Sequence, residues 1–96
     1  MLYLWLPSPQ SAVERVAERV KNGGHNIPDE VVHRRYYRGI KNLLNLYIPI
    51  CDNWYVVNNM STIPEFIAQC WDGTQKIIFS NENWETIIEQ TNGYSG

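Results

Sequence analysis

The sequence of 96 residues is poor in cysteine, in net charge and in long apolar runs. Its two cysteines, Cys51 and Cys70, are too few for a disulfide framework, and their spacing matches no zinc motif. We therefore expect two buried, reduced thiols and no metal site. A net charge of −2 and a pI near 5.6 disfavour general nucleic-acid binding, which usually accompanies a basic domain.

Membrane segments are also missing from the sequence. No apolar run approaches the roughly 20 residues of a membrane helix. The opening MLYLWLPSP has neither the basic start nor the length of a signal peptide. These absences predict a cytoplasmic protein without membrane contact. The length fits one domain over residues 1–92, with a tail at 93–96.

Apolar periodicity and turn residues predict an α/β fold of about three strands and three to four helices. The run LYLWL favours a strand over residues 2–6 that is buried on both faces. Ser8 and Pro9 are typical of a helix start, and Pro49 is expected to end the second helix near Tyr47. The other expected elements are helices 9–22 and 28–47, strand 54–58, a short helix within PEFIAQC (64–70), strand 76–80 and helix 82–90.

Positive charge is concentrated in one part of the chain. Residues 1–50 hold seven basic and four acidic side chains, whereas residues 51–96 hold one and six. In the stretch RVKNGGHNIPDEVVHRRYYRG (19–39), Arg34 and Arg38 share one helix face and Arg35 lies about 100° away. Arg15 and Arg19 have the same four-residue spacing on the preceding helix. If the glycine turn folds the two helices together, up to five guanidiniums could converge, and clustered guanidiniums favour a phosphate ligand.

A solvated helix face is the competing interpretation of these charges. Arg15 is best explained by pairing with Glu14 or Glu18, while for Arg19, Arg34, Arg35 and Arg38 the two interpretations weigh about equally. His25 could donate to a phosphate, although a histidine after Gly-Gly more often stabilises its own turn. The four tryptophans are scattered, which favours core packing. Gly39 inside a helix costs about 1 kcal/mol, so close packing or a ligand contact is expected there.

The segment RVxxGGHxIPxxVxxRRYxRG resembles the lid of the zeta-toxin-like P-loop kinases, predicted ATP-dependent small-molecule kinases. The resemblance extends from LWLPSP through QKIIFSNENWETI, and so covers nearly the whole chain as a C-terminal half of that fold. It implies a partial three-layer P-loop kinase-like architecture. It also implies a lid for nucleotide phosphates, formed by Arg19, His25, Arg34, Arg35 and Arg38. Trp54 matches the aromatic residue before the next core strand, and Asn58 stands where relatives often carry an aspartate.

The sequence departs from that family by an absence. No G-x-x-x-x-G-K-[ST] loop occurs in it, and the upstream magnesium-binding aspartate and candidate base are missing as well. We therefore expect no catalytic residue, no metal and no bound cofactor in the chain alone. ATP and Mg²⁺ are implied only for a complete family enzyme. The strand at 2–6 would then lie at an exposed edge, which predicts a homo-oligomer or a separately encoded N-terminal half as partner.

Three functions follow from these features. The first is a remnant or split half of a kinase, inactive alone, that binds a nucleotide or another phosphate ligand. The second is a non-enzymatic protein-interaction or self-associating module. The third, an unrelated enzyme with His25 as base, is disfavoured because no nucleophile or paired carboxylate lies nearby in the sequence.

Overall fold

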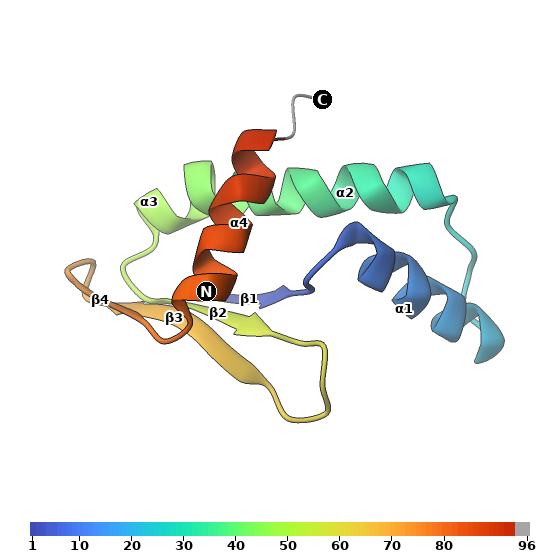
Figure 1. The fold of residues 1–96 in the computed structure, drawn as a ribbon, viewed down its shortest axis with the longest axis horizontal. Helices are drawn as coiled ribbons and strands as arrows, with labels where there is room; N and C mark the ends of the chain where they lie inside the picture. The colour runs from blue at the N-terminus through green and yellow to red at the C-terminus, as the bar shows by residue number, and fades with distance from the viewer. Residues whose placement is uncertain (94–96) are drawn as a thin grey trace.

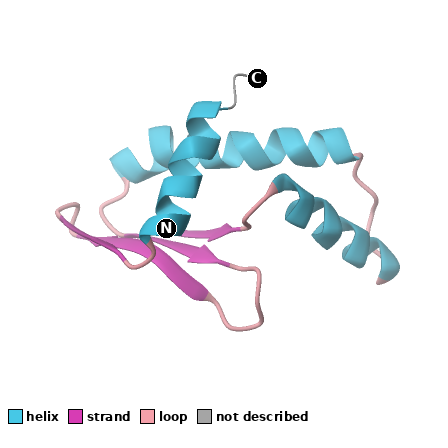
Figure 2. Ribbon diagram, in the orientation of Figure 1, coloured by secondary structure: helices cyan, strands magenta, loops and turns pink. Residues whose placement is uncertain are grey.

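The computed structural model describes residues 1–93, which form a four-stranded sheet with helices over one of its faces and one helix beyond the ends of its strands (Figures 1 and 2). The strands are β1 (Leu2–Trp5), β2 (Trp54–Asn58), β3 (Glu65–Trp71) and β4 (Gln75–Ile78). The helices are α1 (Pro9–Lys21), α2 (Asp29–Asn42), the π-helical segment η1 (Leu43–Tyr47), α3 (Ile48–Ile50) and α4 (Asn81–Gly93). Residues 93–96 were expected as a tail, but Gly93 still belongs to α4, and 94–96 lie outside the described residues.

The sheet is mixed, with strand order β1-β2-β3-β4. β1 and β2 run parallel, and the helices α1, α2, η1 and α3 form the long connection that a parallel pair requires. β3 and β4 then follow as antiparallel neighbours. The fold is therefore α/β, as the sequence indicates, but it has four strands rather than about three.

The fourth strand is β3, and the short helix expected at residues 64–70 is wrong. β3 hydrogen-bonds to β2 on one side and to β4 on the other. A bulge opposite Val56 and Val57 leaves the consecutive residues Ile67 and Ala68 both buried. The bulge breaks the alternation that marks a strand, so the sequence pattern is similar to that of a short buried helix.

One apolar core lies between the sheet and the helices. Trp54 of β2 stacks on Trp84 of α4, with ring centroids 6.0 Å apart and planes within 9°. Lys76 of β4 places its ammonium 4.9 Å from the centroid of the Trp84 ring, which is within cation–π range. The core residues buried around this pair are Trp5, Ile40, Leu43, Val56, Ile67, Ala68, Cys70 and Ile87.

Residues 1–93 form two layers rather than the three expected for a P-loop kinase-like fold. Figure 1 shows α2 and α4 on one side of the sheet and no helix on the other. β1 is accordingly not buried on both faces: Trp5 is buried, whereas Leu2 and Leu4 are 61% and 53% exposed. β1 is also an edge strand, with β2 as its one neighbour in the described sheet.

The second helix continues past the expected end at Tyr47. The Ile48 N–H donates to the Leu43 carbonyl, five residues earlier, as in a π-helix. This wider turn accommodates Pro49, which has no N–H to donate, and α3 then reaches Ile50. Proline thus changes the helix type here rather than ending the helix.

The remaining apolar residues are placed partly as expected. Both cysteines are free; Cys70 is buried, but Cys51 is only half-buried. Three tryptophans are in the core, whereas Trp71 is 50% exposed and does not fit the prediction of core packing. Within residues 1–93, no helix has the length and apolar character needed to cross a membrane.

Candidate functional site

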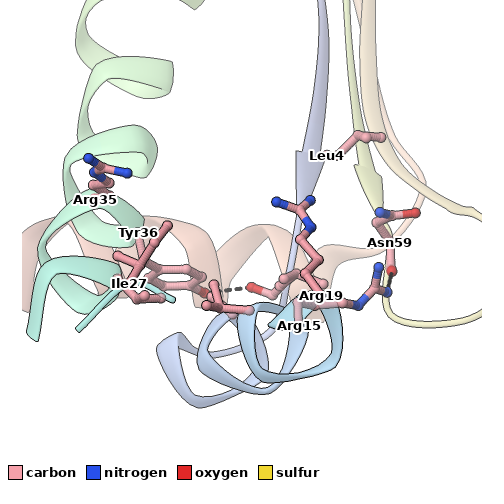
Figure 3. A pocket seen from close by; sticks show the side chains of 11 residues that line it. Leu4, Arg15, Arg19, Ile27, Arg35, Tyr36 and Asn59 are labelled. Carbon is pink, nitrogen blue, oxygen red and sulfur yellow. Dashed lines mark hydrogen bonds between the residues drawn. The ribbon is translucent and has the colours of Figure 1, made fainter. Parts of the chain in front are cut away.

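A hollow of about 360 Å³ lies where the parallel strands β1 and β2 end and the helices α1 and α2 meet (Figure 3). In open α/β sheets, ligands commonly bind beyond the carboxyl ends of parallel strands. The polar lining residues are Arg15, Arg19, Arg35, Tyr36 and Asn59, and the apolar ones are Leu4, Leu6, Ala12, Val16, Ile27 and Val32. The lining therefore combines an apolar wall with three guanidinium groups and contains no carboxylate.

The hollow depends on the fixed start of α1. Ser8 precedes the helix in an extended conformation, and its hydroxyl accepts a hydrogen bond of 3.1 Å from the Ser11 N–H. Pro9 occupies the first helical turn, where a missing N–H has no cost. This start, which the sequence predicts, directs α1 away from the end of β1 and sets the orientation of its arginines.

The double glycine then ends α1 and reverses the chain towards α2. Gly23 has φ +93°, in the left-handed region that favours glycine. The Gly24 N–H donates to the Arg19 carbonyl at 2.8 Å. A Cβ on Gly24 would lie 2.9 Å from that same oxygen, so no other residue fits there without a shift. The turn thus allows α1 and α2 to pack together, so that arginines of both helices line the hollow.

A second constraint on the hollow is the hydroxyl of Tyr36, a half-buried residue of α2. It donates to the Leu6 carbonyl at 2.5 Å and accepts a 3.0 Å hydrogen bond from the Gln90 amide of α4. The same amide donates to the Pro7 carbonyl, and the Gln90 oxygen accepts from the Trp5 indole. Burial raises the pKa of Tyr36 well above its ordinary value, so the phenol stays protonated and able to donate. This network joins β1, α2 and α4.

Close packing explains the helical glycine of α2. A Cβ on Gly39 would lie 3.0 Å from the hydroxyl oxygen of Tyr3 on β1. Burial, with a smaller contribution from Tyr47, raises the pKa of Tyr3 to about 12. Gly39 therefore serves the contact between α2 and the sheet, which is the first of the two explanations expected for it.

The three arginines of the hollow come from both helices. Figure 3 shows Arg15 and Arg19 of α1 on one side and Arg35 of α2 on the other. Arg15 is half-buried and donates to the Asn59 carbonyl, which follows β2. Arg19 and Arg35 are exposed, and within residues 1–93 neither guanidinium makes a hydrogen bond or an ion pair. Two guanidiniums beside an apolar wall thus remain available to an anion.

The structure separates the residues that the sequence grouped as a lid. Arg19 and Arg35 line the hollow, whereas His25, Arg34 and Arg38 are exposed and do not. Arg15 was assigned to pairing with Glu14 or Glu18, and the structure instead joins it to Asn59. Its spacing of four residues from Arg19 was the signal that places both on one face of α1.

Other candidate chemistry is not supported by the described residues. Residues 1–93 contain no group of three His, Cys, Asp or Glu side chains placed to hold a metal. The Asn58 side chain accepts a 3.0 Å hydrogen bond from the Met60 N–H, and so shapes the turn after β2. The arrangement at the hollow can bind an anion, and no described side chain there is placed as a nucleophile or a general base.

Comparison with known proteins gives no relative for this arrangement. No protein-family model, no curated protein and no solved structure matches the chain.

Proposed function

We propose that the chain is the lid-bearing half of an ATP-dependent P-loop kinase similar to the zeta-toxin-like enzymes, and that its hollow binds phosphate groups. The observation that carries the proposal is that Arg15, Arg19 and Arg35 line a single hollow beside the carboxyl ends of two parallel strands. A guanidinium matches phosphate oxygens with two parallel hydrogen bonds, which makes a phosphate chain the best ligand for such a cluster.

The lining supports a phosphate ester better than a free inorganic ion. Leu4, Val16 and Ile27 contribute apolar surface beside the guanidiniums. A volume of about 360 Å³ lies within the range of small-molecule sites, which is about 300–1,000 Å³. A ligand with an apolar or aromatic part next to its phosphates, such as a nucleotide, would use both kinds of surface.

Catalysis by this chain alone is not part of the proposal. Phosphoryl transfer depends on a cradle that positions the triphosphate and its metal ion, and the sequence contains no phosphate-binding loop of that kind. The arginines would supply only the part of the site that neutralises phosphate charge. We expect no turnover of ATP by the chain until a segment or partner that carries such a loop is added.

Isothermal titration with ATP, a UDP-sugar and polyphosphate tests the binding proposal. We expect dissociation constants of about 1 mM or below, and these constants should rise as salt is added. Arg19→Gln and Arg35→Gln should each weaken binding at least about tenfold, since a hydrogen bond to a charged group contributes about 1.5–3 kcal/mol.

The matched controls are Arg34→Gln and Arg38→Gln, which remove the same charge from the same region but outside the hollow. They should change the dissociation constant by no more than about twofold, because these two arginines lie outside the hollow and act on its ligand only through screened, longer-range charge. Equal losses of affinity in all four variants would contradict a defined site in the hollow and would indicate binding to a diffuse basic surface. Absence of heat with all three ligands at millimolar concentration would contradict the proposal.

A further inference from the structure

The uncovered face of the sheet carries two apolar rows across its strands. Backbone register aligns Leu2, Tyr55, Gln69 and Ile77 from β1 to β4. A second row aligns Leu4, Val57 and Phe66. The Phe66 ring contacts the rings of both Tyr55 and Phe79, at centroid distances of 6.4 and 6.5 Å. Trp71 and Gln75 pair on the same face beyond the first row.

This face is large for a protein surface left in water. Its exposed apolar side chains, each 48–61% exposed, are Leu2, Leu4, Phe66, Trp71, Ile77 and Phe79. Since a large side chain presents about 200 Å², they offer roughly 600 Å² of apolar surface together. The largest apolar patch of a typical monomer is about 300–600 Å² and is often functional, and this face lies at the upper end of that range.

The absence of charged residues on this face indicates which kind of partner it fits. Its strand positions hold leucine, valine, isoleucine, aromatic residues and two glutamines, and no Asp, Glu, Lys or Arg. A partner of opposite charge would therefore gain nothing here, whereas an identical face meets no like-charge repulsion. Two copies that each cover roughly 600 Å² would bury about 1,200 Å², the lower limit of stable interfaces.

We propose that a second copy of the chain covers this face, so that two sheets pack face to face around a two-fold axis. Twisted sheets stack in this way with their strands about 30° apart and with interdigitated side chains. Such a pair is isologous, because each copy contributes the same rows. The face shares Leu4 with the lining of the hollow but none of its arginines, and the proposal does not depend on phosphate binding there.

Sedimentation velocity of the full chain, with Leu2→Lys and Ile77→Lys as variants, tests the proposal. The wild-type chain should sediment as a dimer at about 100 μM and dissociate on dilution. Each variant places two lysines in the interface of the dimer, and the dissociation constant should rise at least about 100-fold. Leu2 and Ile77 lie on opposite edge strands, so pairing through the free edge of β1 alone would not respond to Ile77→Lys.

Ile50→Lys is the control, because Ile50 is 70% exposed but belongs to α3 on the helical side. This variant should dimerise like the wild type, and circular dichroism should show the same fold in all variants. A wild-type chain that stays monomeric at about 100 μM would overturn the proposal. A dimer that survives both Leu2→Lys and Ile77→Lys would overturn the assignment to this face.

Discussion

Replacing Tyr36 with phenylalanine tests whether one hydroxyl joins β1, α2 and α4. The change leaves the ring in place but removes the donor to the Leu6 carbonyl and the acceptor for the Gln90 amide. Each of the two lost hydrogen bonds costs about 0.5–1.5 kcal/mol, so the free energy of unfolding should fall by about 1–3 kcal/mol. For a chain of this size that corresponds to a fall in Tm of roughly 5–25 °C.

Urea unfolding followed by tryptophan fluorescence measures this loss, and the midpoint should fall with the slope unchanged. Tyr55→Phe is the control, because within residues 1–93 the Tyr55 hydroxyl makes no hydrogen bond; its effect should stay below about 0.5 kcal/mol. A double-mutant cycle with Gln90→Leu should give a coupling energy of at least about 0.5 kcal/mol. Equal stability of Tyr36→Phe and the wild type would refute the assignment of this hydroxyl as a structural junction.

Three further changes follow from the same structure. Gly24→Ala should destabilise the fold by about 1–2 kcal/mol, since its Cβ would lie 2.9 Å from the Arg19 carbonyl oxygen, whereas Gly93→Ala, with open space around it, should be nearly neutral in thermal melts. Trp84→Ala should lower the free energy of unfolding by about 3–5 kcal/mol in urea titrations, because it empties the core beside Trp54. Burial raises the pKa of Tyr3 from 10.0 to about 12, so the folded state retains a proton that the unfolded state loses above pH 10. The contribution of Tyr3 to the free energy of unfolding should therefore be constant below pH 10 and fall from pH 10 to 12, by at most about 1.4 kcal/mol per pH unit. In urea titrations over this pH range, Tyr3→Phe should show a smaller fall than the wild type.

Local signals in the sequence predicted several elements at their observed positions. The strand expected at 54–58 is β2, and Ser8 with Pro9 marks the start of α1. These features depend on neighbouring residues alone. β3 was missed because its bulge is set by pairing with β2, which is a contact between distant residues. Asp72 and Gly73, both with positive φ, mark the tight turn that joins β3 to β4, and were the signal that a strand also precedes this turn.

Sequence spacing also did not identify which arginines line the candidate site. Arg34, Arg35 and Arg38 are close in sequence, and spacing alone does not say which of them faces α1. The buried face of α2 decides it: Arg35 lies about 60° from Val32 around the helix, and Arg34 about 160° from it. The apolar stripe through Val32 and Ile40 could have separated these arginines before the structure was known.

The arginine side-chain Nε–Hε signals, followed by nuclear magnetic resonance during titration with inorganic triphosphate, test the central claim most directly. The account predicts that the signals of Arg19 and Arg35 shift together and saturate, with Arg15 following, because these three line the hollow. The signals of Arg34 and Arg38 should move little. Shifts of equal size at all five arginines, or none at any of them, would contradict a phosphate site between α1 and α2.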